Sequence, residues 1–286
     1  FPGEDGIRAQ PRSRGLGDVY KRHILLACCV YGPLRLDSIQ AGLEERKADR
    51  IEVGIVQGFF SPDERSAVGP SAYISRTRKL IEQHPGMDLL LWPEGTNGIP
   101  LDLGSESLYW RLHPETGEPG KKFIRDEFEI PLVFGGAGLT IADDGQGKSL
   151  IKDSYNISVY LSADGKQGIY RKNHPVPFGE AVPGFDLLPE SWQAALPNIG
   201  NLSLGADNPT MSLGENTFRN LICYEAVLPE YVRQAALGSD FLVNITEDYW
   251  YGNTAHIEQH RSVLILRAVE SRICLLYTSP SPRDRG

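Results

Sequence analysis

Short apolar runs that end abruptly constrain the fold of this chain more than any other feature of its sequence. The clearest is residues 87–92, where Met-Asp-Leu-Leu-Leu-Trp stops at a Pro-Glu pair, and similar runs occupy residues 51–56, 131–134 and 241–245. Continuous apolar runs of this length are typical of strands buried on both faces of a sheet. We therefore expect a buried sheet with strands at these positions.

Helix-like segments separate the apolar runs. They are residues 72–83, 121–129, 230–236 and 257–272. Strands that alternate with helices indicate an α/β domain. Residues 155–161 and 168–171 flank Asp164-Gly165, which is a strong turn signal, so they predict a β-hairpin. A hairpin requires a mixed sheet rather than a purely parallel one.

Composition excludes several classes of function. The chain has 286 residues with a formal net charge of -8, and it contains no Lys/Arg run that could track phosphates, so we expect no nucleic-acid partner. The four cysteines, at positions 28, 29, 223 and 274, show no CxxC or Cys/His ligand spacing. This spacing argues against a zinc site and against a disulfide framework, and we expect no metal and no cofactor.

Cys223 is the first candidate for chemistry. It follows an apolar stretch that reads as the end of a buried strand, and Glu225 comes two residues later. A cysteine at the end of a strand is a common position for a nucleophile. The structural alternative is that Cys223 is a small buried hydrophobe, which is the usual role of a free cysteine.

Glu94 and Lys172 complement this cysteine. Glu94 ends the strand at residues 87–92, and Lys172 follows the second strand of the hairpin. A thiol needs a base or a nearby cation to become a thiolate, a carboxylate can shuttle the proton, and an ammonium can stabilise both thiolate and oxyanion. Either residue alone could equally be an ordinary surface side chain. Together the three residues predict a nucleophilic acyl-transfer site.

These motifs resemble a known family signature. Trp92-Pro-Glu94, Tyr170-x-Lys172 and Cys223-Tyr-Glu225 are similar to the Glu-Lys-Cys signature of the nitrilase (carbon-nitrogen hydrolase) superfamily, and they occur in that order. The resemblance implies an α/β fold of the αββα sandwich type with mixed sheets.

A finer resemblance points to the apolipoprotein N-acyltransferase branch of this superfamily. Pro177-Phe-Gly-Glu180 is similar to the segment that follows the lysine in that branch. Residues 244–252, Gln259-His260 and residues 267–270 are similar to its region after the cysteine. The similarity extends over about residues 51–273.

The resemblance implies a two-step transfer. Cys223 would attack an acyl ester of a phospholipid, with Glu94 as the base and Lys172 as the partner of the thiolate and the oxyanion. The acyl chain would then pass to the α-amine of a diacylglyceryl-cysteine at the N-terminus of a lipoprotein. The resemblance also implies a bacterial inner-membrane location, with the catalytic domain on the periplasmic side.

The same resemblance implies supporting roles for three more residues. Glu180 and Glu225 would support the site, and Tyr224 would place a backbone N–H near the oxyanion. The structural alternatives are that Glu180 only belongs to a turn and that Glu225 only forms an ion pair. We expect His174 and His260 to be positional rather than catalytic, because the chemistry needs no imidazole.

Both ends of the chain depart from the family pattern. Residues 1–22 are rich in Gly, Pro and Arg, resemble nothing in the family, and are expected to be non-native or disordered. Residues 23–50 are expected to contain the end of a membrane helix and a linker, residues 51–274 the catalytic domain, and residues 275–286 a non-native tail. The sandwich is therefore expected to be incomplete at its C-terminus.

Two other readings remain open. A soluble nitrilase-type amidase would use the same three residues with water as the second acceptor, without flanking membrane helices. A non-catalytic nitrilase-fold scaffold that binds a partner would tolerate loss of Glu94, Lys172 or Cys223, and all three are present.

Overall fold

The computed structural model describes residues 16–45, 50–58, 71–104, 129–143, 149–165, 167–182, 184–189, 191–192, 202–251 and 254–278. The chain divides into two compact units, Phe1–Arg50 and Ile51–Gly286. Each unit is described by itself.

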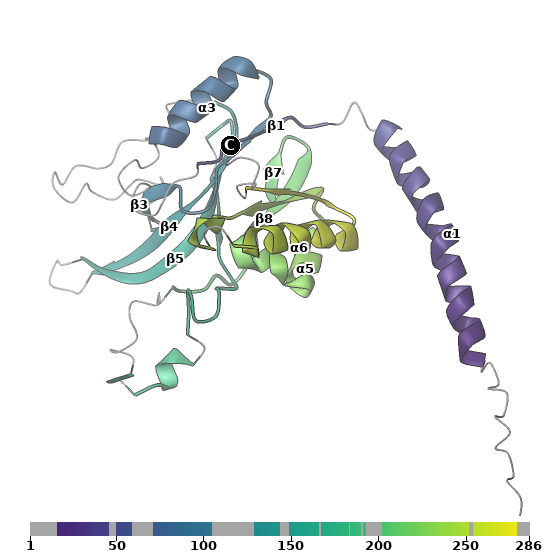
Figure 1. The fold of residues 1–286 in the computed structure, drawn as a ribbon. Helices are drawn as coiled ribbons and strands as arrows, with labels where there is room; N and C mark the ends of the chain where they lie inside the picture. The colour runs from purple at the N-terminus through teal and green to yellow at the C-terminus, as the bar shows by residue number, and fades with distance from the viewer. Residues whose placement is uncertain are drawn as a thin grey trace, which may run out of the picture. The chain divides into compact units, whose positions relative to one another are not determined.

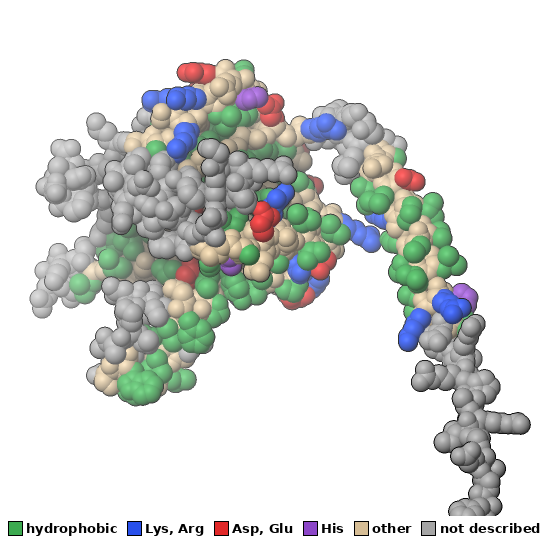
Figure 2. Space-filling view, in the orientation of Figure 1, with side chains coloured by type: hydrophobic (Ala, Val, Ile, Leu, Met, Phe, Trp, Pro, Cys, Tyr) green, Lys and Arg blue, Asp and Glu red, His purple; other side chains and the backbone are tan. Residues whose placement is uncertain are grey.

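The described part of the first unit is one helix, α1 (Leu16–Glu45), with Pro33 inside it. Apolar side chains such as Ile24, Leu26 and Leu34 are exposed along its length (Figure 2). Among the described residues, no helix combines the length and the hydropathy that crossing a membrane requires.

Helix α1 is longer than the sequence pattern predicts. Residues 1–22 were expected to be non-native or disordered, and residues 23–50 to contain the end of a membrane helix and a linker, yet Leu16–Glu45 form one continuous helix. The segment from Leu36 to Glu45 contains mainly good helix formers (Leu, Gln, Ala, Glu), so propensity extends the helix where no amphipathic period marks it.

The first sheet of the second unit has six strands in the order β1-β2-β4-β5-β6, with β3 also paired to β4. Their bounds are β1 Val53–Ile55, β2 Leu89–Leu91, β3 Asn97–Asp102, β4 Leu132–Asp143, β5 Ser149–Leu161 and β6 Gln167–Arg171. β1, β2, β3 and β4 pair in parallel, and β5 is antiparallel to both β4 and β6. The predicted mixed sheet is confirmed, including the β5–β6 hairpin with Gly165 at φ 85°.

The second sheet has four strands in the order β10-β9-β8-β7. Their bounds are β7 Met211–Leu213, β8 Asn216–Ile222, β9 Phe241–Ile245 and β10 Cys274–Tyr277. β8, β9 and β10 run in parallel, and β7 is antiparallel to β8.

Helices cover the outer faces of the two sheets (Figure 1). α3 (Ser71–Gln83) packs on the first sheet, while α5 (Pro229–Ala236) and α6 (His256–Ser271) cover the second. The layer order is therefore α3, first sheet, second sheet, then α5 with α6. This is the αββα sandwich that the resemblance implies.

Side-chain alternation along the strands explains the layers. In β2, Leu90 packs toward α3 whereas Leu89 and Leu91 pack into the core between the two sheets. In β9, Leu242 packs toward α5 and α6 while Val243 enters the core between the sheets. Successive side chains of a strand point to opposite faces, so a continuous apolar run fills two cores at once.

Most predicted elements are present in the structure. The helices predicted at 72–83, 230–236 and 257–272 correspond to α3, α5 and α6 within one residue. The helix predicted at 121–129 lies, apart from its last residue, outside the described residues. β3 and β7 were not predicted, since β3 carries a proline and β7 is only three residues long.

The C-terminal strand corrects one expectation. Residues 275–286 were expected to be a non-native tail and the sandwich to be incomplete at its C-terminus, but Cys274–Tyr277 pair with β9 in register from Phe241 to Asn244. Thr278 is buried, and its hydroxyl accepts a hydrogen bond from the Thr246 N–H at 3.0 Å. The apolar residues Leu275 and Leu276 supply the strand signal, which the sequence analysis set aside because the segment departs from the family pattern.

Candidate active site

Glu94 lies just beyond the end of β2. Trp92 anchors this end, since its indole N–H donates to Thr77 Oγ1 at 3.0 Å inside the core beneath α3. Gly135 on β4 permits the close approach of the Glu94 backbone, because a Cβ at position 135 would lie 2.6 Å from Glu94 Cα. The strand end and this glycine together fix the Glu94 carboxylate.

Lys172 follows the last residue of β6, and its backbone N–H donates to Asn156 O at 2.9 Å. Its side chain is only 3% exposed, and its Nζ lies 3.5 Å from Glu94 Oε1 and 2.7 Å from Glu180 Oε2. Burial alone would lower the pKa of Lys172. The charges of Glu94, Cys223 and Glu180 outweigh it and raise the pKa above its ordinary value, so the ammonium stays protonated.

Cys223 is buried at the junction between β8 and the 3-10 helix η3 (Cys223–Val227). Its backbone has φ 50°, a left-handed conformation that is uncommon for a residue other than glycine. Burial first, and the Glu94 charge second, raise the pKa of its thiol well above the ordinary value, whereas Lys172 and a hydrogen bond with Thr246 lower it. The resting thiol is therefore protonated and needs a base.

Asn156 on β5 connects the two carboxylates. Its side-chain amide donates to Glu94 Oε1 at 2.7 Å and to Glu180 Oε1 at 3.2 Å. The sequence analysis did not single out this residue. Only the pairing of β5 with β4 and β6 brings it between Glu94 and Lys172, so no local signal marks it.

Glu180 belongs both to a turn and to the site. The turn closes with a hydrogen bond from the Glu180 N–H to Val176 O at 2.9 Å, and the Val176 N–H in turn donates to Glu180 Oε2 at 2.7 Å. This geometry directs the carboxylate to Lys172, whose Nζ donates to Oε1 at 2.7 Å. The turn interpretation and the supporting role are thus compatible.

Glu225 lies fully buried behind Cys223. Its carboxylate accepts bonds from the backbone N–H of Ile222 at 2.8 Å, of Asn173 at 2.7 Å and of His174 at 3.0 Å. It therefore ties the end of β8 to the segment that follows Lys172. Burial raises the pKa of Glu225, while these hydrogen bonds favour its charged form.

Two tyrosines extend this network. Tyr170 belongs to the Tyr170-x-Lys172 motif but was given no role of its own, and Tyr231 was not predicted. Tyr170 Oη donates to Glu225 Oε1 at 2.6 Å and lies 2.7 Å from Tyr231 Oη. The Tyr231 hydroxyl also accepts from Asn173 Nδ2 at 2.8 Å.

Tyr224 begins the turn after Cys223 and is half-buried. Backbone N–H groups at the start of a helix have no partner within it, so they remain free to bind an anion.

A cavity of about 560 Å³ opens onto these residues. Glu94, Cys223, Asn156 and Glu180 line it, together with a mainly apolar wall. That wall includes Gly136, Ala137, Tyr155, Val176, Leu202 and Tyr251. The cavity therefore combines the Cys223 thiol, the Glu94 carboxylate and apolar surface. The Lys172 ammonium is not part of the lining and lies behind it, 3.5 Å from Glu94 Oε1.

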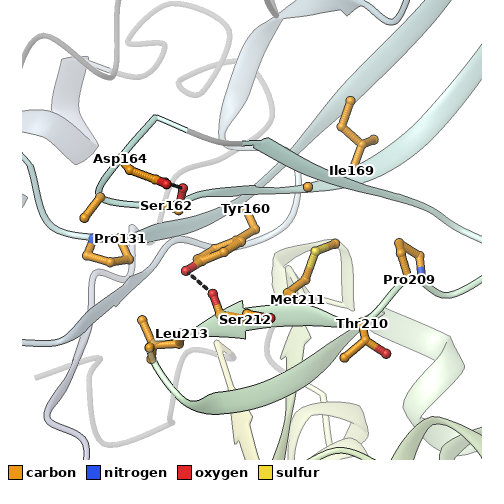
Figure 3. A pocket seen from close by; sticks show the side chains of 13 residues that line it. Pro131, Tyr160, Ser162, Asp164, Ile169, Pro209, Thr210, Met211, Ser212 and Leu213 are labelled. Carbon is orange, nitrogen blue, oxygen red and sulfur yellow. Dashed lines mark hydrogen bonds between the residues drawn. The ribbon is translucent and has the colours of Figure 1, made fainter.

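A larger cavity of about 750 Å³ lies at another edge of the sandwich, between the β5–β6 hairpin and β7 (Figure 3). Its polar contacts are structural. Tyr160 Oη donates to Ser212 O at 2.8 Å, and Ser162 bonds to Asp164. Its lining residues include no cysteine, lysine or histidine, and none of the residues predicted to be catalytic.

Among the described residues, one group could hold a metal ion, namely Asp248, His256 and His260. It borders the active-site cavity through Tyr251, whose ring stacks on His256 with centroids 3.5 Å apart. The expectation of no metal site depended on the cysteine spacing and did not consider this group.

The fold is an α/β sandwich of the nitrilase type, with a buried cysteine, a carboxylate and an ammonium close together at the strand ends. A sequence model of the carbon-nitrogen hydrolase family matches residues 66–280, which is more than half of the chain. The chain belongs to this family, as its motifs predicted. The match continues past residue 273, where the resemblance was expected to stop.

Curated relatives of the chain are apolipoprotein N-acyltransferases. The protein of that name from Geobacter metallireducens is 30% identical over 261 residues, covering 88% of this chain and 45% of the relative. The one from Sinorhizobium medicae is 38% identical over 197 residues, covering 66% of this chain and 34% of the relative. The chain thus spans less than half the length of these relatives.

Solved structures support the fold. Saccharomyces cerevisiae Nit3, a member of the nitrilase superfamily, matches with a TM-score of 0.55 at 21% identity, covering 82% of this chain and 78% of Nit3. A Nesterenkonia amidase from the same superfamily matches with a TM-score of 0.50 at 17% identity, covering 80% of this chain and 76% of the amidase. At these identities the likeness concerns the fold alone.

Proposed function

We propose that this chain carries the catalytic domain of an apolipoprotein N-acyltransferase, with Glu94, Lys172 and Cys223 as its catalytic residues. The observation that carries the proposal is that Glu94 and Cys223 line one largely apolar cavity, with the Lys172 ammonium 3.5 Å from the Glu94 carboxylate. The similarity to curated apolipoprotein N-acyltransferases supports the choice of reaction within the family.

The first half-reaction forms a thioester. Glu94 accepts the proton of the Cys223 thiol, which is protonated at rest because burial raises its pKa. The thiolate attacks the ester carbonyl carbon of a phospholipid and forms a tetrahedral intermediate. When this intermediate collapses, the C–O bond breaks, Glu94 returns the proton to the departing alkoxide, and a lysophospholipid leaves.

Two groups can stabilise the oxyanion of this intermediate. The Lys172 ammonium remains charged, since the surrounding acidic groups raise its pKa. The backbone N–H of Tyr224 stands at the start of η3, directly after the nucleophile. Fixed donors of this kind commonly contribute about 10²- to 10³-fold to the rate.

The second half-reaction transfers the acyl chain. The α-amine of an N-terminal diacylglyceryl-cysteine attacks the thioester carbonyl, Glu94 takes a proton from the amine, and the Cys223 thiolate departs. An amide forms on the lipoprotein, and the proton returns from Glu94 to the thiolate, so the enzyme is regenerated without any cofactor.

The remaining site residues hold this arrangement together. Asn156 orients Glu94, and Glu180 compensates the charge of the buried Lys172. Glu225 fixes the backbone on both sides of the nucleophile through its bonds to Ile222 and Asn173. Each is a positioning residue rather than a catalytic one.

The surroundings of the cavity suit a lipid donor. Val176 and Leu202 line it, and the neighbouring Phe178 and Leu204 expose apolar side chains, 69% and 53% exposed respectively. A phospholipid acyl chain and a lipidated acceptor match such apolar surface. By the same proposal the full-length enzyme acts at the bacterial inner membrane, with this domain on the periplasmic side.

Intact-protein mass spectrometry tests the first step. The chain is mixed with phospholipid vesicles, and one acyl mass is expected on the peptide that contains Cys223. Cys223→Ala should abolish this adduct, whereas Cys274→Ser, which changes a cysteine outside the cavity, should retain it.

Adding an acceptor then distinguishes the alternatives. A synthetic N-terminal diacylglyceryl-cysteine peptide should discharge the thioester and gain an amide-linked acyl chain. Release of free fatty acid alone, equally fast without the peptide, would favour a hydrolase that uses water. Absence of any adduct with retained activity of Cys223→Ala would refute the mechanism.

A further inference from the structure

Three potential metal ligands lie together at the junction of η4 (Asp248–Tyr251) and α6. His256 and His260 occupy the first two turns of α6, four residues apart, which places them on the same face of the helix. This is the spacing by which two histidines of one helix commonly bind a single metal ion. Asp248, the first residue of η4, lies close to both of them.

Their separations are close to those of a coordination shell. One ring nitrogen of each histidine and one carboxylate oxygen of Asp248 all lie within 4.8 Å of one another. Ligands of a tetrahedral zinc ion are about 3.3 Å apart, because each lies about 2.0 Å from the metal. The pair His260 Nδ1 and Asp248 Oδ1 is already at 3.1 Å, so only the half-buried His256 must move inward.

Burial fixes two members of this group. The side chains of His260 and Asp248 are 3% and 0% exposed, and His260 Nδ1 lies 3.1 Å from Asp248 Oδ1. An imidazole nitrogen and a carboxylate oxygen held this close in a buried position are two ligands already arranged for one ion.

We propose that Asp248, His256 and His260 bind one divalent transition-metal ion, with zinc as the ion that this donor set suits best. Two imidazoles and one carboxylate favour zinc or its neighbours over Mg²⁺ and Ca²⁺, which prefer oxygen ligands alone. The fourth position would hold water. This site is additional to the proposed acyl transfer, which needs no metal.

The ion would have a structural effect at the active-site cavity. Asp248 and His256 bracket the segment that carries Tyr251, whose ring stacks on His256 and lines the cavity beside Cys223. A metal bound to both ends of this segment holds Tyr251 in place. Metal binding should therefore also raise the melting temperature of the chain, since it stabilises only the folded state.

Calorimetric titration with ZnCl₂ tests the site. Thiols also bind zinc, so the chain should carry Cys28→Ser, Cys29→Ser, Cys274→Ser and Cys223→Ala. Saturable binding of one ion is expected, and Co²⁺ in its place should give the strong visible absorption of a tetrahedral complex. His256→Ala should weaken binding at least about tenfold, as expected for loss of a ligand.

A matched control is His84→Ala. His84 also lies near a carboxylate, with its Nδ1 3.7 Å from Glu52 Oε1, but this pair is exposed and has no second histidine. Its substitution should leave zinc affinity unchanged. The principal variant is at half-buried His256, so that folding is preserved. Absence of saturable binding, or equal affinity in the His256→Ala and His84→Ala chains, would overturn the proposal.

Discussion

Lys172 lies closer to Glu180 than to Glu94: its Nζ is 2.7 Å from Glu180 Oε2 and 3.5 Å from Glu94 Oε1. Glu180 is therefore the main counterion of the buried ammonium. Glu94 Oε1 also accepts a hydrogen bond from the Asn156 amide at 2.7 Å. Lys172 and Asn156 thus both hold the Glu94 carboxylate at the cavity that Cys223 lines.

Replacement of Glu180 should therefore slow the chemistry without removing a reacting group. In Glu180→Gln the ammonium loses its nearer counterion and should pair more tightly with Glu94, which weakens that carboxylate as a base. We expect acylation of Cys223 to slow by about 10- to 100-fold, less than the loss of a general base itself. A time course of the acyl adduct by mass spectrometry measures this rate.

Glu230→Gln is the matched control for this substitution. Glu230 forms an exposed ion pair with Arg233 on α5, at 2.6 Å, so the change in charge and shape is the same but remote from the cavity. Its acylation rate should equal that of the unmodified chain. An equally fast Glu180→Gln variant would show that Glu180 belongs to the turn alone.

The sequence predicts the meeting of Glu94, Lys172 and Cys223 because each directly follows a strand, and strand ends gather at the edges of a sandwich. It gives no local sign of Asn156, and it marks Tyr170 only as part of the Tyr170-x-Lys172 motif without indicating its contact; both lie inside strands whose pattern is dominated by burial. Their polar ends reach Glu94 and Glu225 only through tertiary pairing across 62 and 55 positions of the chain. Such contacts depend on sheet order, which no local motif specifies.

The two charges beside Cys223 should have opposite effects on its titration. Burial raises the pKa of the thiol, and the Glu94 charge raises it further, whereas Lys172 lowers it. Lys172→Met should therefore move the pKa upward, and Glu94→Gln should move it downward. Because only the thiolate is alkylated, the rate with iodoacetamide rises about tenfold per pH unit below the pKa, and its profile should shift in the same directions.

In Glu94→Gln, Cys223 should therefore be alkylated more readily at neutral pH. Acyl transfer by this variant should be about 10²- to 10⁴-fold slower, because the general base is missing. Alkylation of Cys274 in the same samples serves as the internal reference. Its raised pKa has burial as its only cause, so its profile should not change. If the Cys223 pKa moved in the same direction in the Glu94→Gln and Lys172→Met variants, the opposite effects assigned to these two charges would be wrong.

The extremities of the fold were the least predictable parts. The hydrophobic pattern marks where a buried strand must lie, but α1 exposes apolar residues all along its length and shows no amphipathic period. For β10, Leu275 and Leu276 supply an apolar signal, but they do not indicate which strand β10 pairs with. Its parallel partner β9 lies more than 30 positions earlier in the chain. The hydrogen bond between Thr246 and Thr278 spans a similar separation of 32 positions. α6 connects the two strands in sequence and packs on the outer face of their sheet, and this packing brings β10 next to β9.

Gly135 should tolerate no side chain. A Cβ there would lie 2.6 Å from Glu94 Cα and 2.9 Å from Gly95 N, and both are backbone atoms that cannot rotate away. Gly135→Ala should displace Glu94, lower the melting temperature and slow acylation at least about tenfold, as small misplacements of reacting groups do. Gly86→Ala is the control, since no atom lies within 4 Å of its Cβ position. Equal melting temperatures and rates in the two variants would contradict this account.

Thr278 should stabilise the segment around Thr246, which lies next to Cys223. Its hydroxyl accepts from the Thr246 N–H at 3.0 Å, and the Thr246 side chain in turn lowers the pKa of Cys223, against the larger effect of burial. Thr278→Val keeps the shape but leaves the buried N–H unpaired, which should cost about 1–3 kcal/mol of unfolding free energy. Urea unfolding measures this loss, with exposed Thr210→Val as the control. If both variants unfold at the same urea concentration, residue 278 lies outside the fold, as the sequence analysis expected.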